Sequence, residues 1–262
     1  LGERTIDIIV HEQLGDVLFD EHVVRTITDL RDRVLRQPGG RIVPSRLRLM
    51  VEPVKLADDR HVPMMRDVTT GHGLDFACLQ PLVRPQDEDP DYHHFRSSDP
   101  SLVEYFLAGS DCDGGVGNER NDKGTGSGTP AWAIDLQTCA PDATGPHKKL
   151  RFSRKVTRAG RLDALCIYFE AHGGGGGDGT GESENGSASS KMITTGPMAH
   201  RAAHWGYRLL RCPKDACEVG DVLDIEMWVT SDSCWEDLNA WRWKVTRKQA
   251  SQKPKTKRRR KR

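Results

Sequence analysis

The chain lacks any long apolar run. Nothing in its 262 residues approaches the roughly 20 apolar residues of a membrane-spanning helix, and no apolar core of a secretory signal precedes the first expected strand. We therefore expect no membrane partner. The sequence also lacks the pattern of a disulfide framework, because its cysteines number seven, an odd count, and are scattered from Cys78 to Cys234. Their number and placement favour free thiols in a reducing compartment.

The net charge of +1 conceals a segregation of charge along the chain. Eight of the 39 Lys and Arg residues lie in the last ten positions, KPKTKRRRKR, so 31 remain against 38 Asp and Glu elsewhere. Because like charges repel, we expect residues 249–262 to form a disordered basic tail. Such a tail suits nuclear import or a nucleic-acid contact, and a solvated tail without a partner is the alternative. We expect the protein in nucleus and cytoplasm.

The first fifty residues indicate strand, helix and strand. The β-branched run TIDIIV is typical of a fully buried strand of a parallel sheet. A helix is expected within EHVVRTITDLRDRVLRQPGG, capped by Asp20 and ended at Pro38-Gly39-Gly40. Its apolar stripe comprises Val23, Ile27, Leu30 and Val34, and the side chains expected to face away are Arg25, Thr28, Asp32 and Arg36. In RIVPSRLRLMVEPV, apolar residues alternate with Arg46, Arg48 and Glu52, which predicts a strand with one solvent-exposed face.

Short, often alternating segments follow, and they favour an antiparallel sandwich or barrel. They are PAWAIDLQTC, HKKLRFSRKVT, RLDALCIYFEAH, HWGYRLLRC, DVLDIEMWVT and AWRWKVTRK. One short helix is expected at 100–109, PSLVEYFLAG. Two low-complexity stretches, at about 109–129 and 172–191, contain too few apolar residues to offset the entropy of ordering, so we expect flexible insertions there.

Two carboxylates flank the loop HEQLGDVLFDEH. Glu12 follows the carboxyl end of the first strand, where open α/β sheets place ligands, and Glu21 precedes the helix, whose positive dipole end favours an acid. A loop folded back at Gly15 and Asp16 would bring both acids to one pocket. Facing carboxylates repel unless a cation bridges them, and a guanidinium fits because it is planar and forked. Acids in a first helical turn are also common without any function.

Five segments, in order, resemble those of the protein arginine methyltransferases. DIIVHEQLG…DE resembles the family's double-glutamate loop, in which a strand leads into S-E-x-x-G and a second glutamate lies nine residues after the first; His11 replaces the serine. GGRIVPSRLRLMVEPV resembles the crossing into the barrel, and GLDFACL the Y-G-[LF]-D-[FM]-S-x-[IL] segment after it. ITTGPMAHRAAHWGYRLL resembles the S-T-x-P…T-H-W-x-Q segment, with Ala203 in place of the threonine. VGDVLDIEMWV resembles a late barrel strand.

The resemblance spans about residues 5–248 and implies a fold. It implies an α/β remnant of a Rossmann-like class I methyltransferase domain, followed by a mainly antiparallel β-barrel domain. The expected boundaries are 1–44 for the edge of the methyltransferase domain, 45–248 for the substrate-binding barrel and 249–262 for the basic tail.

The resemblance also implies a reaction, the transfer of methyl from S-adenosylmethionine to a guanidinium nitrogen of protein arginine. It implies that Glu12 and Glu21 hold the guanidinium as catalytic residues, that His204 and Trp205 line the substrate side, and that Val23 or Thr26 contacts the cofactor. The expected substrates are arginine-rich proteins such as histones or RNA-binding proteins. The acidic body agrees with a basic substrate.

The chain departs from the family pattern at its beginning. The family's glycine-rich cofactor turn and ribose-binding acid precede the first strand, whereas this chain begins at Leu1. We therefore expect a fragment of a longer protein, or a chain that has lost its cofactor half, unable to bind S-adenosylmethionine with useful affinity. Family members dimerise through an arm inserted in the barrel, and residues 86–129 occupy its place, so a homodimer is expected of the full-length protein.

Two other functions stay open. One is a catalytically inactive relative, whose barrel serves as a binding or scaffold partner of an active methyltransferase. The other is a zinc module built from Cys212, Cys217, His200 and His204. Because these residues do not repeat with finger-like spacing, the sequence favours no metal site.

Overall fold

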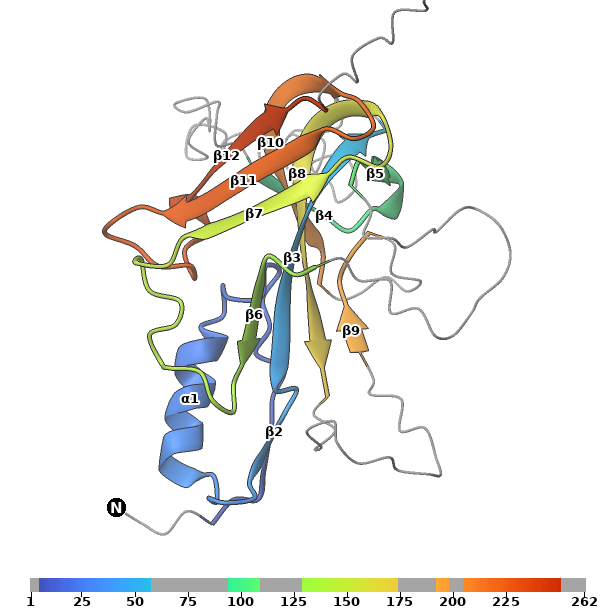
Figure 1. Ribbon diagram of the computed structural model, residues 1–262. Helices are drawn as coiled ribbons and strands as arrows, with labels where there is room; N and C mark the ends of the chain where they lie inside the picture. The colour runs from blue at the N-terminus through green and yellow to red at the C-terminus, as the bar shows by residue number, and fades with distance from the viewer. Residues whose placement is uncertain (1–4, 58–93, 109–128, 174–191, 198–204, 251–262) are drawn as a thin grey trace, which may run out of the picture.

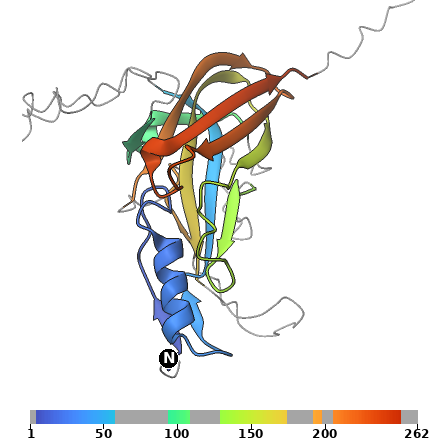
Figure 2. The same cartoon turned by 90° about the vertical axis from the view of Figure 1, so that its left-hand side faces the viewer.

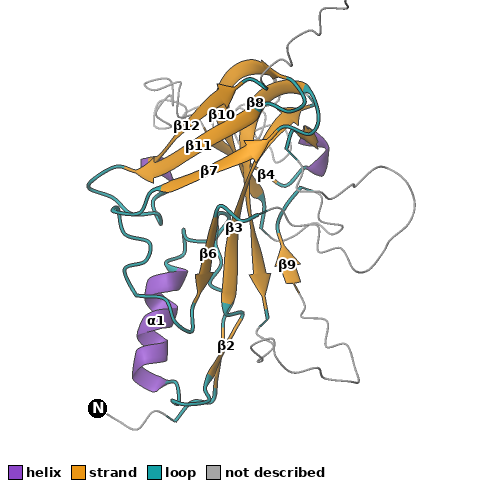
Figure 3. Cartoon of the chain, in the orientation of Figure 1, coloured by secondary structure: helices purple, strands orange, loops and turns teal. Residues whose placement is uncertain are grey.

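The computed structural model describes residues 5–57, 94–108, 129–173, 192–197 and 205–250. Strands dominate this part of the chain, which contains a single α-helix (Figure 3). The arrangement is that of a mainly antiparallel β-barrel domain with a small α/β unit attached. That unit, with α1, lies at one end of the long strands, and a three-stranded sheet lies at the other end (Figures 1 and 2).

The N-terminal unit comprises β1 (Ile8–Val10), α1 (Val23–Val34) and β2 (Arg41–Val43). Strands β1 and β2 pair in parallel, with Ile9 opposite Ile42. The expectation of a fully buried first strand is wrong, since Ile8 is 46% and Val10 is 76% exposed while Ile9 points into the core. The physical reason is that, among the described residues, this sheet has only two strands, and the core packs against only one of its faces. Side chains on the other face are therefore exposed.

Helix α1 has the expected apolar stripe, with Val23 and Ile27 fully buried. Two details of the prediction are wrong. Asp20 does not cap the helix, because its carboxylate accepts a hydrogen bond from the Val17 amide at 3.2 Å, and His22 occupies the N-cap position without a side-chain cap. Thr28 is buried, because its hydroxyl donates to the Val24 carbonyl at 2.7 Å within the helix and so needs no water.

The large sheet has the order β4-β10-β8-β3-β5, with β6 added to β3 and β9 to β8. Every pairing in it is antiparallel. Its strands are β3 (Arg46–Leu56), β4 (His94–Ser97), β5 (Val103–Phe106), β6 (Trp132–Asp135), β8 (Gly160–His172), β9 (Met192–Thr194) and β10 (Tyr207–Cys217). A second sheet, of order β12-β11-β7, is formed by β7 (Leu150–Lys155), β11 (Val222–Val229) and β12 (Trp241–Lys248).

The predicted strands between 130 and 248 are confirmed, and two nearby expectations are wrong. The helix expected at 100–109 is not formed by its described residues, 100–108: a 3-10 turn, η4 (Pro100–Leu102), leads into β5, whose Tyr105 pairs with Lys55 of β3. A second 3-10 turn, η5 (Leu238–Ala240), precedes β12. The solvent-exposed face expected for β3 is not continuous, since Met50 to Val54 are all buried and Glu52 pairs with Arg154 in the interior.

A row of aromatic rings connects the N-terminal unit to the three-stranded sheet. Phe19 lies against Trp132 of β6 at a centroid distance of 4.8 Å, and Trp132 lies edge-on to Trp235 at 5.4 Å. Trp235 in turn packs on Trp241 at 5.0 Å. Arg31 of α1 adds two hydrogen bonds of 2.9 Å, to the carbonyls of Leu136 and Cys139. The loop before α1 is therefore packed against the barrel and fixed relative to it.

Several expectations fall outside the described residues. They concern the 73–79 segment, residues 86–93 and 109–128 of the expected arm, most of both low-complexity stretches, and the tail beyond residue 250. Five cysteines that are described are free thiols: Cys139, Cys166, Cys212, Cys217 and Cys234. Among the described residues, no helix has the length and apolarity needed to cross a membrane.

Candidate functional site

The loop between β1 and α1, residues 11–22, is anchored by its apolar side chains. Leu14, Val17, Leu18 and Phe19 are each at most 1% exposed and belong to the main core. Among the polar residues of the loop, Glu12, Glu21 and His22 are exposed. Burial of four side chains in a twelve-residue segment gives the loop a fixed course, so its carboxylates project from a stable base.

The backbone of this loop adopts conformations that L-residues rarely take. Among the described residues, the two non-glycine residues with positive φ are Leu18 (78°) and His22 (58°), and both lie here. At Gly15 a Cβ atom would overlap the Asp20 carboxylate, so a larger residue at this position requires that side chain to move. Such conformations persist where packing enforces them, and they gather at functional sites.

The carboxylates of Glu12 and Glu21 are both exposed. Within the described part of the chain, neither carboxylate takes part in an ion pair or accepts a hydrogen bond. The Gln13 side chain joins the two ends of the loop, because its amide donates to the Glu21 carbonyl at 2.7 Å and to the Thr26 hydroxyl at 3.3 Å. The loop thus folds back between Glu12 and Glu21 and presents two acids with unused acceptor atoms.

Asp16, midway between the two glutamates, ties the loop to the large sheet. Its carboxylate lies 2.9 Å from Nε of Arg96 on β4 and 3.4 Å from Nη2 of Arg208 on β10. The Asp16 and Arg208 side chains are only 17% and 19% exposed, so this contact is screened less than a surface ion pair. Two barrel strands therefore hold the middle of the loop.

His11 fixes the beginning of the loop. Its Nε2–H donates to the carbonyl of Pro44, directly after β2, at 2.9 Å. Burial lowers the pKa of His11, and the hydrogen bond to Pro44 only partly opposes that shift. A neutral His11 therefore occupies the position where the resembling family has serine, and it links the ends of β1 and β2.

The other expected site residues have different environments. Val23 is completely buried, and the Thr26 hydroxyl is engaged by Gln13. Trp205 is partly exposed and packs edge-on against Phe169 of β8, with centroids 5.8 Å apart. His204 lies outside the described residues. The cofactor and substrate roles of these four residues stay predictions.

The zinc alternative gains no support from the described residues. Cys212 and Cys217 are both buried on β10, and burial raises the pKa of Cys212 to about 12. A metal ligand must be a thiolate. Within the described ranges, no cluster of three or more Cys, His, Asp or Glu side chains could hold a metal ion.

Sequence reasoning missed the supports of the loop, namely Gln13, Asp16, Arg96 and Arg208. Gln13 could have been suspected from its place inside the loop. No sequence signal pairs Asp16 with Arg208, which is 192 residues away. The contact exists because β4 and β10 are neighbours in the large sheet, with Arg96 and Arg208 opposite each other.

No protein-family model matches the chain. Protein arginine N-methyltransferase 6 of Danio rerio is 31% identical over 85 residues, a match that covers 32% of this chain and 24% of that protein. The matched segment thus spans about a quarter of the length of this curated relative.

Two solved structures share the fold. Protein arginine methyltransferase 10 of Arabidopsis thaliana superposes with a TM-score of 0.61 at 19% identity, covering 97% of this chain and 69% of the other. The PRMT1 enzyme–prozyme heterotetrameric complex of Trypanosoma brucei with AdoHcy gives 0.60 at 16% identity, covering 96% and 66%. The chain is thus similar over 85 residues to one protein arginine N-methyltransferase, and it shares its fold with solved structures of protein arginine methyltransferases.

Proposed function

We propose that this chain takes part in the methylation of protein arginine, with Glu12 and Glu21 holding the substrate guanidinium. The observation that carries the proposal is the loop itself: two exposed carboxylates without partners, on a backbone held by buried side chains and by the Asp16 ion pairs. A guanidinium presents five N–H donors in a plane and has no acceptor. Two carboxylates that can each accept from it therefore match its charge and its shape.

The role of the two glutamates is to orient the substrate guanidinium and to polarise it. Hydrogen bonds from the guanidinium to both carboxylates concentrate positive charge on the nitrogens that are held, which leaves the remaining nitrogen more nucleophilic. S-adenosylmethionine, when bound, would supply an electrophilic methyl group. Holding the nucleophile in line lowers the entropic part of the barrier, and this is the part of catalysis that residues of this chain can provide.

The described residues offer little of a cofactor site. The Val23 side chain is buried in the core, and the Thr26 hydroxyl is bonded to Gln13. On β1, by contrast, Ile8 and Val10 expose apolar side chains that a continuing sheet would bury. We therefore infer that residues 1–44 form the edge of a Rossmann-like methyltransferase domain, that 45–248 form the substrate-binding barrel, and that the cofactor is held mainly by residues outside this chain.

Oligomerisation and nuclear import belong to the same proposal. The T. brucei relative is described as a heterotetrameric complex, which agrees with an oligomer. We propose that the full protein is a homodimer, and that the basic residues of 249–262 direct it to the nucleus as well as the cytoplasm. Its substrates are proposed to be arginine-rich proteins such as histones or RNA-binding proteins.

The test is methyl transfer from radiolabelled S-adenosylmethionine to an arginine-rich peptide by the protein expressed from its complete gene. Glu12→Gln and Glu21→Gln, which keep the side-chain shape, are each expected to reduce the rate at least about a hundredfold, as loss of a positioned charged group does. Glu218→Gln is the matched control, because Glu218 is an exposed acid after β10, away from the loop. Full activity in both loop variants would contradict the proposal.

The alternative is an inactive relative that binds an active methyltransferase. Two observations favour this alternative. His11 stands in place of the family's serine, and the burial of Val23 and the bond from Gln13 to Thr26 leave these two side chains little access to a cofactor. The same assay separates the two functions, since an inactive relative shows no transfer even with unaltered Glu12 and Glu21.

A further inference from the structure

The outer face of the β12-β11-β7 sheet has a composition unlike the rest of the acidic body. Along β11, Leu223, Ile225 and Met227 are buried beneath the sheet, and Asp224, Glu226 and Trp228 alternate with them on the outside. The same alternation places basic side chains of β7 and β12 on this outer face.

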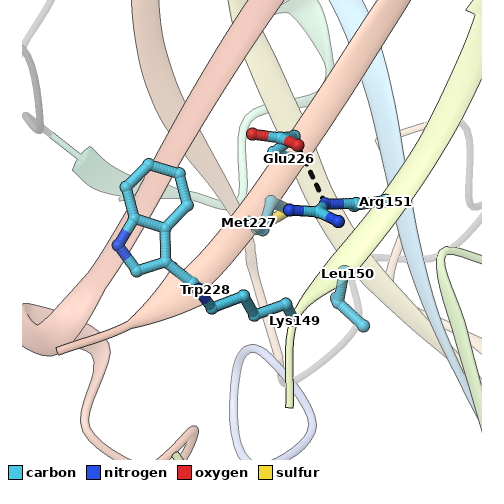
Figure 4. Close-up of a pocket in the computed structure, with 6 residues that line it drawn as sticks. All are labelled: Lys149, Leu150, Arg151, Glu226, Met227 and Trp228. Carbon is cyan, nitrogen blue, oxygen red and sulfur yellow. Dashed lines mark ion pairs between the residues drawn. The ribbon is translucent and has the colours of Figure 1, made fainter. Parts of the chain in front are cut away.

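The register of the three strands arranges the outer residues in rows. Trp228 is opposite Arg242 of β12, and Lys149, just before β7, lines the same shallow pocket as Trp228 (Figure 4). The next rows cross the sheet as Arg151–Glu226–Lys244, Ser153–Asp224–Thr246 and Lys155–Val222–Lys248. Six basic side chains thus share this outer face with two acidic ones: Lys149, Arg151, Lys155, Arg242, Lys244 and Lys248 against Asp224 and Glu226.

Both acids are already neutralised within the sheet. Glu226 lies 2.9 Å from Nε of Arg151, a pair visible in Figure 4, and Asp224 lies 2.5 Å from Nζ of Lys248. Lys149, Lys155 and Lys244 are exposed, and none of them forms an ion pair with another described residue. The outer face therefore carries a net positive charge that is not compensated locally.

Trp228 differs from the tryptophans of the core. Trp235 and Trp241 are at most 1% exposed and donate their ring N–H groups to backbone carbonyls, whereas Trp228 is partly exposed on the outer face. Arg242 beside it is held in place by hydrogen bonds to the carbonyls of Asn239 and Trp241, at 2.8 and 2.9 Å. An aromatic ring flanked by cations on a rigid sheet is thus open to a ligand.

We propose that this outer face, from Lys149 and Trp228 to Lys155 and Lys248, binds single-stranded nucleic acid. The lysines would contact phosphates, and the Trp228 ring would stack on a base, as on other single-strand-binding surfaces. An acidic peptide would use the charges but has no need of the ring, and an arginine-rich substrate is repelled here. The surface is therefore separate from the proposed arginine site at Glu12 and Glu21, and it does not depend on that function.

The basic sequence after residue 250 requires a control, because it also attracts polyanions. Binding of a fluorescein-labelled 20-nucleotide oligo(U) or oligo(dT) is measured by anisotropy over a range of salt concentrations. The proteins compared are the full chain and a chain truncated after Ala250, which keeps the amide that donates to Asp221. The truncated chain is expected to retain measurable, salt-dependent binding.

Two sets of variants test the surface. Replacing Lys149, Lys155 and Lys244 together by Gln is expected to weaken binding at least tenfold and to reduce the slope of log K against log salt by about 2, since each phosphate contact on a single strand contributes about 0.7. The control removes the same charge elsewhere, through Arg25→Gln, Arg41→Gln and Lys214→Gln, and is expected to change affinity less than about threefold.

The ring is tested with Trp228→Leu and Trp228→Phe. Leucine keeps apolar bulk but cannot stack, so about a tenfold loss is expected, whereas phenylalanine is expected to keep most of the affinity. Urea unfolding and near-ultraviolet circular dichroism verify that each variant is folded. Equal losses in both triple variants, unchanged binding by Trp228→Leu, or complete loss on truncation after Ala250 would overturn the proposal.

Discussion

Asp16 and Arg208 form an ion pair across 192 positions of sequence, with Oδ2 and Nη2 separated by 3.4 Å and both side chains mostly buried. Arg96 adds a second guanidinium to the same carboxylate at 2.9 Å. The contact matters because Asp16 lies between the two acids of the candidate arginine site. The large sheet therefore determines where the centre of that loop lies.

Removal of the Asp16 carboxylate is expected to loosen the loop. Asp16→Asn keeps the shape but not the charge, and it leaves the mostly buried Arg208 without its anion, so the unfolding free energy should fall by about 1–3 kcal/mol. Amide hydrogen exchange of residues 11–22 should accelerate in this variant. Asp29→Asn is the control, because Asp29 pairs with Arg33 on the exposed side of α1. Unchanged exchange in Asp16→Asn would show that the apolar side chains alone hold the loop.

Gly15→Ala is expected to destabilise the chain by about 1–3 kcal/mol, because the added methyl group overlaps the Asp20 carboxylate. Shortening Asp20 in the double variant Gly15→Ala/Asp20→Ala should recover part of that loss. Urea unfolding of the wild type, both single variants and the double variant gives the coupling energy. Strict additivity would mean that the overlap is relieved by backbone movement.

The buried pair of Glu52 and Arg154 should give a pH-dependent stability. Burial raises the pKa of Glu52 to about 7 from 4.5, against the opposing effect of Arg154 at 3.1 Å. A raised pKa means that the folded state binds the proton more tightly, so this contribution is complete below pH 4.5 and is lost as pH rises towards 7.

The effect is measured as the difference in unfolding free energy between the wild type and Glu52→Gln, from denaturation between pH 4.5 and 8. The stability of the wild type relative to the variant should decline over the interval by on the order of 3 kcal/mol. The comparison cancels the opposite contribution of His11, whose lowered pKa stabilises the fold as pH rises. A constant difference would show that Arg154 keeps Glu52 ionised throughout.

Trp132→Leu is expected to reduce stability by about 2–4 kcal/mol, because it removes the middle ring between Phe19 and Trp235. The effect should reach the loop through Phe19, so exchange protection of residues 14–19 should fall as well. Trp228→Leu serves as the matched control, since Trp228 is outside this row of rings. Comparable losses in the two variants would contradict a connecting role for the row.

The sequence predicts those parts of the fold that depend on local periodicity. The spacing of Val23 and Ile27 predicts α1, and the alternation along β11 predicts a strand with one buried face. The prediction fails where a distant partner changes the environment: Glu52 was expected in solvent, but Arg154 neutralises it inside the barrel. It also fails at Asp20, where the turn amide of Val17 competes with the helix end for the same carboxylate.

In the candidate site, too, local sequence patterns and distant contacts differ in how well they can be predicted. The resemblance singles out Glu12, Gly15 and Glu21 because one continuous segment contains them, and their roles stay predictions. The contacts of Asp16 with Arg96 and Arg208 depend on the order of strands in the large sheet, which no local pattern encodes.

The first strand has a practical consequence for handling the protein. Among the described residues β1 pairs only with β2, so its other edge presents unpaired amide and carbonyl groups next to the exposed side chains of Ile8 and Val10. An open apolar edge is a template for pairing with another strand. The isolated chain should therefore self-associate as its concentration rises, and a lysine at Val10 should raise its solubility without disturbing the barrel.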